Sequence, residues 1–202
     1  MSDVVGVNDA PGNTPIDPDE LVQLIPSLAT KQELDEWERK NIIDARTWAL
    51  SPRTVGSRDP FVEPYLRELH RRMFDQTWKW AGKYRKTEKN IGCTVPEIAN
   101  RLGALLGDAR YWAEHDTYPP DEIAVRFHHR LVGTIHPFPN GNGRHARLHA
   151  DVIAVKLGRA EFTWGRNDLV GAGPARARYL DALRALDADD RNVKPLLEFA
   201  RS

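Results

Sequence analysis

The chain has 202 residues, and its 29 lysines and arginines balance 29 aspartates and glutamates, so no overall field favours nucleic acid or an anionic membrane. A single cysteine, Cys93, excludes an internal disulfide and disfavours a thiolate metal site. The first residues lack the pattern of a signal peptide, and no apolar run reaches the roughly 20 residues of a membrane span. We expect a cytoplasmic protein that has no membrane partner and no direct nucleic-acid partner.

Residues 1–29 are predicted to form an acidic, proline-containing flexible leader, and residues 30–202 a single domain. Residues 1–20 contain aspartates, a glutamate and prolines but no lysine or arginine. That composition is typical of a mobile segment rather than a packed element.

From Thr30 onward the sequence predicts one helix after another. Thr30 with Glu33, and Thr94 with Glu97, have the spacing of a capping box, and each pair precedes apolar residues at helical intervals. Asp59 and Pro60, and later Pro120, mark further helix starts. The predicted helices cover about 30–48, 60–73, 94–112, 120–131, 143–157 and 174–187, with a short last helix from about 191. The sequence therefore predicts a mainly α-helical fold.

The segment WAGKYRKTEKNIGCTV, residues 80–95, interrupts this helical pattern. It has a glycine near each end and alternates polar with bulky residues, which favours a short β-hairpin. Its cations Lys83, Arg85, Lys86 and Lys89 form a basic surface that either steers an acidic target or is simply solvated.

The sequence HPFPNGNGRHAR, residues 136–147, carries the candidate chemistry, and it begins with a candidate base. Pro137 restricts the residue before it, so the preceding helix is expected to end at or just before His136. An imidazole with an unperturbed pKa of about 6.5 can remove a proton from a hydroxyl at neutral pH. Beside a phosphate cradle, His136 therefore predicts phosphoryl-group chemistry.

The second half of the same sequence has the features of an anion site. Gly141, Asn142 and Gly143 allow close backbone approach, and the helix that starts next supplies N–H donors and a positive dipole end. Arg144 and Arg147 lie three residues apart on one helical face. At a helix start each cation costs roughly 0.3–1 kcal/mol unless something negative lies nearby. A bound polyphosphate accounts for both arginines.

The loop resembles the signature of Fic-domain proteins, His-x-Phe-x-(Asp/Glu)-Gly-Asn-Gly-Arg-x-x-Arg. The matching positions are His136, Phe138, Gly141, Asn142, Gly143, Arg144 and Arg147. The resemblance extends from about residue 31 to 190, with WAGKYR at the position of the family's target-binding flap. Within the family, the amino-acid sequences of this loop and of the upstream segment RRMFDQTWKWAG are similar to those of the "mobile mystery protein B" branch.

The resemblance implies a Fic-type helical bundle with a flap at about 82–95 and the motif loop at 136–147. It also implies transfer of AMP, or another nucleoside monophosphate, from ATP to a serine, threonine or tyrosine hydroxyl of a target protein, with Mg²⁺ present and with a toxin role by association. His136 would be the base, Asn142 would hold the α-phosphate with the loop N–H groups, and Arg144 and Arg147 would hold the β- and γ-phosphates.

The resemblance further implies that the flap pairs with an extended target segment by adding a strand. The flap residues expected to contact the target are Lys83, Tyr84, Arg85 and Lys86.

Two features depart from the family pattern. The position of a Mg²⁺-binding carboxylate is Asn140, whose neutral amide oxygen is a weaker ligand, so the metal would rest mainly on substrate phosphates. The family's inhibitory motif, Ser/Thr-x-x-x-Glu-Gly/Asn, is missing from the sequence. We therefore expect a separate restraining chain, such as an antitoxin-like or helix-turn-helix protein, with Glu33, Glu36 or Glu38 as an alternative internal partner for Arg147.

Two other functions stay open at this stage. His145 and His149 have H-x-x-x-H spacing and could, with His136, form a metal hydrolase site, although Ala146 stands where a zinc protease has glutamate. Alternatively, Asn140 marks a catalytically silent module that binds a nucleotide or a partner. No residue pattern identifies the nucleotide base, the target or the oligomeric state.

Overall fold

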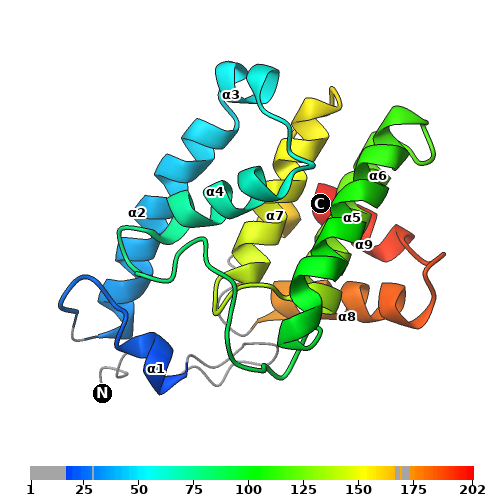
Figure 1. The fold of residues 1–202 in the computed structure, drawn as a ribbon. Helices are drawn as coiled ribbons and strands as arrows, with labels where there is room; N and C mark the ends of the chain where they lie inside the picture. The colour runs from blue at the N-terminus through cyan, green and yellow to red at the C-terminus, as the bar shows by residue number, and fades with distance from the viewer. Residues whose placement is uncertain (1–16, 29, 167–168, 170–172) are drawn as a thin grey trace.

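The computed structural model describes residues 17–28, 30–166, 169 and 173–202, and it is mainly α-helical, as predicted (Figure 1). Its α-helices are α1 (Pro18–Leu21), α2 (Lys31–Ala49), α3 (Pro52–Ser57), α4 (Glu63–Phe74), α5 (Ile98–Glu114), α6 (Pro120–His129), α7 (Asn142–Lys156), α8 (Pro174–Ala188) and α9 (Lys194–Arg201). Shorter helical turns are Val95–Glu97, Arg130–Ile135 and Trp164–Arg166.

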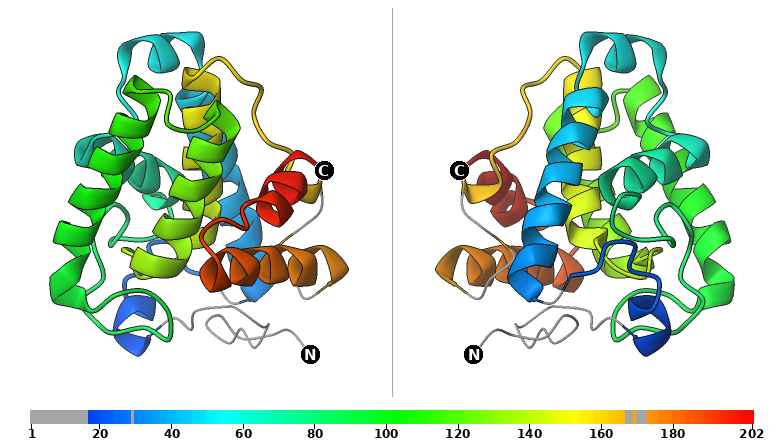
Figure 2. Two further views of the ribbon diagram at one scale, coloured as in Figure 1. Left: turned by 90° about the vertical axis from the view of Figure 1, so that its right-hand side faces the viewer. Right: turned by 90° about the vertical axis from the view of Figure 1, so that its left-hand side faces the viewer.

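Helix α7 lies at the centre of the bundle, between α2 and α4 on one side and α5 and α6 on the other (Figure 1). Helices α8 and α9 pack together beside α6 (Figure 2). Ala146, Ala150 and Ile153 of α7 belong to a core shared with α5, α6, α8 and α9, whereas Leu148 and Val152 belong to a core shared with α2 and α4. Because α7 joins both cores, its first turn is supported from two sides.

Most predicted helix starts are confirmed. At the start of α2, the N–H of Glu33 donates to Thr30 Oγ1 at 3.2 Å and the N–H of Thr30 donates to Glu33 Oε2 at 3.0 Å, which completes a capping box. The second helix was predicted from Asp59–Pro60, but α4 begins at Glu63. Asp59 instead accepts the N–H of Phe61 at 2.8 Å, a turn that competes with helix formation.

The predicted β-hairpin over residues 82–95 is wrong, because the structure shows only turns and bends between residues 82 and 94. We call residues 82–94 the flap loop. Gly82 and Gly92 have φ angles of 73° and 96° and reverse the chain near its two ends. The alternating pattern was misleading because Arg85 and Cys93 are buried beneath the loop rather than placed on one face of a ladder.

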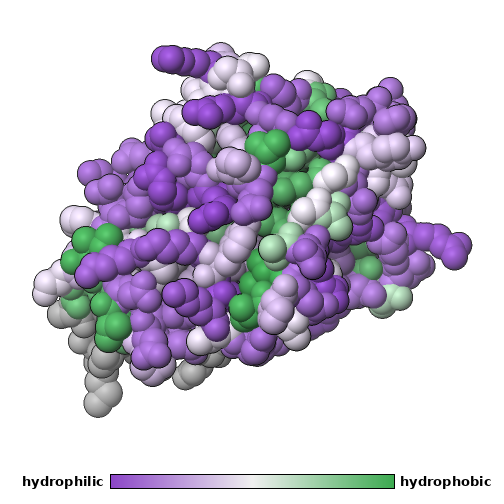
Figure 3. Space-filling model, in the orientation of Figure 1, coloured by the Kyte–Doolittle hydropathy of each residue, from purple (hydrophilic) through white to green (hydrophobic). Residues whose placement is uncertain are grey.

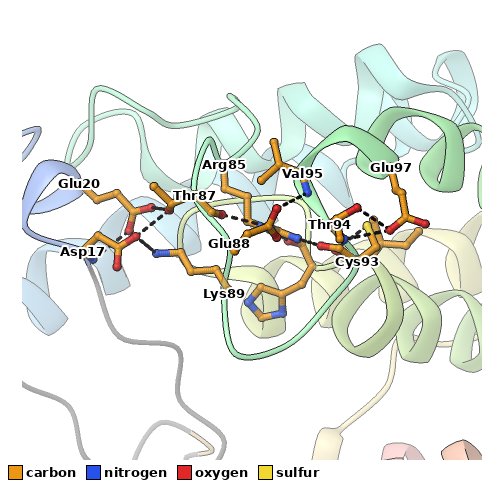
Figure 4. Close-up of polar contacts among 12 residues, drawn as sticks. Asp17, Glu20, Arg85, Thr87, Glu88, Lys89, Cys93, Thr94, Val95 and Glu97 are labelled. Atoms are coloured by element: carbon orange, nitrogen blue, oxygen red, sulfur yellow. Dashed lines mark hydrogen bonds and ion pairs between the residues drawn. The ribbon is translucent and has the colours of Figure 1, made fainter.

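Residues 17–28, the described part of the predicted leader, pack against the domain, whereas residues 1–16 lie outside the described residues. Leu24 forms an isolated antiparallel bridge with Trp78. In the flap loop, Lys89 Nζ lies 2.7 Å from Asp17 Oδ2 and 2.8 Å from Glu20 Oε2. Helix α1 is therefore held on the flap loop by two ion pairs (Figure 4).

The described surface gives no sign of a membrane-spanning element. None of the helices in the described ranges is both long and apolar enough to cross a bilayer. The face in Figure 3 is mainly hydrophilic, with apolar side chains in separate patches. Large apolar side chains with substantial exposure are Val22, Ile25, Trp37, Ile43, Ile91 and Tyr111. Of these, Trp37 is 48% exposed.

Five buried histidines predict a loss of stability in acid. Burial lowers the pKa to about 3 for His70 and His128, to about 4 for His136 and His149, and well below 6.5 for His145. Below pH 6.5 the unfolded chain binds protons that the folded chain excludes, so the stabilisation present above pH 6.5 is lost as pH falls toward 4. We expect the unfolding free energy from urea titrations to fall steeply between pH 7 and pH 5.

The variant His149→Gln tests the origin of this slope. Its amide N–H₂ can still donate to the carbonyl of Pro60, which His149 Nε2 contacts at 2.8 Å. Removing one titrating group should reduce the slope by up to about 1.4 kcal/mol per pH unit. An unfolding free energy that is flat between pH 7 and pH 5 in the parent protein would contradict the prediction.

Candidate functional site

The candidate base follows a π-helical turn. The N–H of His136 donates to the carbonyl of Leu131 at 3.0 Å, which closes the turn Arg130–Ile135. His136 has φ 51° and ψ 61°, a left-handed conformation that costs a non-glycine residue roughly 1–2 kcal/mol. The helix thus ends immediately before His136, which confirms the boundary predicted from Pro137.

The ring of His136 is held in one orientation and is buried, with the residue only 6% exposed. Its Nδ1 lies 2.8 Å from the carbonyl oxygen of Val132. Because a carbonyl only accepts, Nδ1 carries the proton and Nε2 carries the lone pair of the neutral ring. Burial lowers the pKa of His136 to about 4, and the positive charges of Arg85 and Lys89 lower it further. The hydrogen bond to Val132 acts in the opposite direction and raises the pKa. At neutral pH the ring is therefore a neutral proton acceptor at Nε2.

The loop after His136 is built around Phe138 and Asn142, both buried. The Asn142 side chain closes on the Phe138 backbone twice, because its Oδ1 accepts the Phe138 N–H at 3.0 Å and its Nδ2 donates to the Phe138 carbonyl at 2.8 Å. The side chain of Asn142, the residue expected to hold a phosphate together with the loop N–H groups, thus shapes the loop. The N–H groups of the α7 first turn have no acceptor within the helix and could meet an anion.

Gly141 sets the entry into α7. Its φ of 76° lies in the left-handed region, and a Cβ added there would lie 2.4 Å from Cζ of Phe74. A Cβ on Gly143, by contrast, would meet only Nη1 of Arg147 at 3.6 Å. The sequence thus needs glycine at 141 for both conformation and space, which lets the loop lie directly on α4.

Sequence reasoning missed His70, which supports the loop from α4. Its Nδ1 accepts the N–H of Gly82 at 3.0 Å, so Nε2 carries the proton and donates to the carbonyl of Asn140 at 3.1 Å. The ring stacks on Phe138 with centroids 3.6 Å apart. His70 therefore links the motif loop to the flap loop, although in the sequence it is only one more residue of an amphipathic helix.

The two arginines of the motif are held by different helices. Arg144 forms an ion pair with Glu38 of α2, and its Nη2 lies 3.3 Å from Asn140 Oδ1. Glu38 was weighed as a partner for Arg147, and the structure places it on Arg144 instead. The guanidinium of Arg147 lies 5.6 Å from the ring centroid of Tyr179 in α8. The arginines thus flank the start of α7 on the α2 side and on the α8 side.

The side chain of Asn140 makes polar contacts within the motif loop. Its Oδ1 accepts the N–H of Gly141 at 2.7 Å as well as the contact from Arg144. Among the described residues there is no group of three or more histidine, cysteine, aspartate or glutamate side chains that could hold a metal ion. The residues present therefore fit a metal that rests on bound phosphates, with Asn140 at most as a weak neutral ligand.

The histidine pair of α7 has a structural position. Nε2 of His145 lies 3.0 Å from the carbonyl of Leu66, and Nε2 of His149 lies 2.8 Å from the carbonyl of Pro60. Both histidines are fully buried and are kept neutral by burial, which lowers the pKa of each. They join α7 to α4 and the segment before it, and the structure gives no support to a hydrolase site made of His136, His145 and His149.

The predicted flap residues divide into outward and inward side chains. Lys83 and Lys86 are exposed, whereas Tyr84 is half-buried and its ring centroid lies 5.8 Å from that of Phe138. Arg85 is buried and points under the flap loop. The basic surface expected of this segment is therefore smaller than the sequence indicates.

Taken together, the described residues form a helical protein in which a neutral, oriented histidine and the N-terminus of α7 lie at the two ends of one short loop. Residues 60–154 match the model of the Fic/DOC family. The matched residues include the whole motif loop, so this part of the chain belongs to the Fic/DOC family.

Similar proteins extend this comparison. The protein adenylyltransferase Fic of Aedes aegypti is 24% identical over 172 residues, covering 83% of this chain and 32% of its own length. The protein of the same name from Drosophila grimshawi is 32% identical over 136 residues, covering 65% of this chain and 26% of its own length. The chain thus spans about a third or less of the length of these relatives.

The fold is shared with solved structures. The BepC protein of Bartonella tribocorum, a VirB-translocated effector solved with bound AMPPNP, superposes with a TM-score of 0.67 at 16% identity, covering 92% of this chain and 97% of that one. At this identity the comparison shows a common fold.

Replacing Gly141 tests the entry into α7. The variant Gly141→Ala should lower the unfolding free energy by about 2–4 kcal/mol, since its Cβ meets Phe74 and its φ is left-handed. In the matched control Gly103→Ala, within α5, a Cβ meets nothing within 4 Å, so this variant should be neutral or gain up to about 1 kcal/mol. Urea titration measures both, and a Gly141→Ala protein as stable as its parent would contradict this account.

Proposed function

We propose that the chain transfers AMP, or another nucleoside monophosphate, from a nucleoside triphosphate to a serine, threonine or tyrosine hydroxyl of a target protein. The observation that carries the proposal is His136, a neutral ring held through Nδ1 on the loop that leads into the anion site of α7. The proposal is supported by curated relatives that are named adenylyltransferases and by a structural relative solved with an ATP analogue.

In the proposed reaction, these groups act on a bound nucleoside triphosphate and on the hydroxyl of a target protein. The target hydroxyl oxygen attacks the α-phosphorus, and the bond from that phosphorus to the oxygen bridging the β-phosphate breaks, so that diphosphate leaves. The hydroxyl proton passes to Nε2 of His136. The N–H groups at the α7 start stabilise charge on the phosphates, and Arg144 and Arg147 approach them from two sides.

Mg²⁺ is proposed as a cofactor bound through the nucleotide phosphates, where it would neutralise part of their charge. Since Arg144 is already paired with Glu38, the β- and γ-phosphates must compete with that carboxylate for the guanidinium. Nucleotide binding is thus accompanied by a change in the Glu38–Arg144 contact.

The proposed partner is a target protein that lies along the flap loop, with the exposed Lys83 and Lys86 at its edge. From the sequence we also propose a separate restraining chain, a toxin role, membership of the "mobile mystery protein B" branch and a cytoplasmic location. Glu38, which pairs with Arg144, is the internal alternative to a restraining partner. If the purified chain becomes active only after Glu38→Gln, Glu38 itself is the restraint.

Loss of the base is the direct test of the activity. ATP labelled at the α-phosphate should label a protein band in a bacterial lysate, and His136→Ala should reduce that label by about 10²–10⁴-fold. The control His115→Ala removes an exposed histidine of the segment after α5 and should label as the parent does. Labelling that persists in His136→Ala would overturn the assignment of the base.

Asn140→Asp tests the departure from the family motif. The carboxylate keeps an acceptor for the N–H of Gly141 and adds a charged ligand for Mg²⁺, so half-maximal labelling should need less Mg²⁺. If the parent is inactive and Asn140→Asp is active, the chain is a silent nucleotide-binding module in its present form. An unchanged Mg²⁺ requirement would show that position 140 does not face the metal.

A further inference from the structure

Arg85 is a buried cation whose side chain has no access to solvent. Its Nε donates to the carbonyl of His136 at 2.8 Å, and its Nη1 donates to the carbonyl of Thr87 at 3.0 Å. Nη2 donates to the carbonyl of Cys93, and Glu88 Oε2 lies 3.3 Å from Nη1 (Figure 4). Burying a guanidinium is unfavourable unless its donors are satisfied, and here the acceptors come mainly from backbone.

These acceptors join two separate segments of the chain. Thr87 lies in the middle of the flap loop and Cys93 near its C-terminal end, while His136 begins the motif loop. The main-chain N–H of Arg85 also donates to the carbonyl of Pro137 at 3.0 Å. Arg85 therefore shapes the flap loop and fixes it to the residue that carries the candidate base.

The contact between the two loops is close at Gly92. A Cβ on Gly92 would lie 2.5 Å from Cβ of His136 and 2.7 Å from the carbonyl oxygen of Ile135. The N–H of Cys93 lies 3.4 Å from that same carbonyl. At Gly92 the flap loop thus lies directly on Cβ of His136 and on the backbone of Ile135.

His136 needs such support because its backbone is in a left-handed conformation. On one side Val132 accepts from the ring Nδ1, and on the other Arg85 donates to the main-chain carbonyl. Lys89, whose side chain is also buried, adds a second positive charge near the ring, and it is paired with Asp17 and Glu20.

We propose that Arg85 is a positioning residue that holds the flap loop and the base His136 as one unit, so that a target segment bound along the flap meets Nε2 in a fixed orientation. This role rests on the proposed function. It differs from the role predicted from the sequence, in which Arg85 contacts the target, since the side chain is turned away from solvent.

The first test is Arg85→Met, which keeps an unbranched side chain and removes the charge and the donors. The matched control is Arg126→Met, since Arg126 is also buried and binds Glu122 at 2.8 Å and the carbonyl of Asp190 at 2.9 Å. Histidine ring resonances are followed by NMR against pH, with His136 assigned by its loss in His136→Ala. This readout does not depend on any enzymatic activity.

In Arg85→Met, the ring signal of His136 should shift because the donor to its main-chain carbonyl is lost. Its pKa, which burial mainly lowers, should rise because one nearby cation is removed. In Arg126→Met the signal and the pKa should stay as in the parent. Where the parent labels a target, Arg85→Met should lower kcat by about 10–10²-fold with little change in KM for ATP. A folded Arg85→Met protein with an unchanged His136 titration would overturn the proposal.

A second variant applies if Arg85→Met does not fold. Gly92→Ala keeps the guanidinium but forces the flap loop away from His136, and Gly158→Ala is its control, since Gly158 also has a positive φ of 78° but nothing within 4 Å of an added Cβ. The proposal expects a shifted His136 signal in Gly92→Ala only. An unchanged His136 signal in Gly92→Ala would overturn the proposal. If the signal shifts in Gly92→Ala but the parent labels no protein, the positioning role of Arg85 stands and the transferase function is rejected.

Discussion

The site depends on one constraint, namely that a loop buried in the interior must have its backbone polar groups satisfied. Some of the loop's backbone groups are met by side chains from other parts of the chain, and others by a side chain of the loop itself. Arg85 donates to the carbonyl of His136, His70 donates to that of Asn140, and Asn142 closes the loop from within. These contacts fix a loop whose conformation is unfavourable on its own. They also fix the position of the His136 ring relative to the N-terminus of α7.

The same logic explains two arginines at the positive end of a helix. Such cations oppose the dipole, and the sequence suggests a bound anion as compensation. The structure supplies part of that compensation internally, because Glu38 of α2 neutralises Arg144 and the electron-rich ring of Tyr179 lies under Arg147. A phosphate is therefore not needed to hold the arginines in place, but it must displace or share their present contacts.

Local patterns in the sequence were sufficient for the helices and for the shape of the motif loop. The capping box at Thr30, the restriction by Pro137 and the need for glycine at 141 are consequences of neighbouring residues, and all three are seen in the structure. What failed depended on distant contacts. The alternating residues of the flap loop do not form a hairpin, because Arg85 turns inward and donates to the carbonyl of His136, 51 residues away in sequence. No local signal distinguishes such a residue from a solvated cation.

Asn140 gains a further meaning from its contact with Arg144. A carboxylate at this position would lie against a guanidinium that Glu38 already neutralises, and it would add a second negative charge beside the start of α7. A metal ion would then be needed to offset that charge. The amide of Asn140 makes the hydrogen bonds to Gly141 and Arg144 without adding that charge, and its oxygen is a weaker metal ligand than a carboxylate. The substitution thus alters the charge balance of the site rather than its architecture.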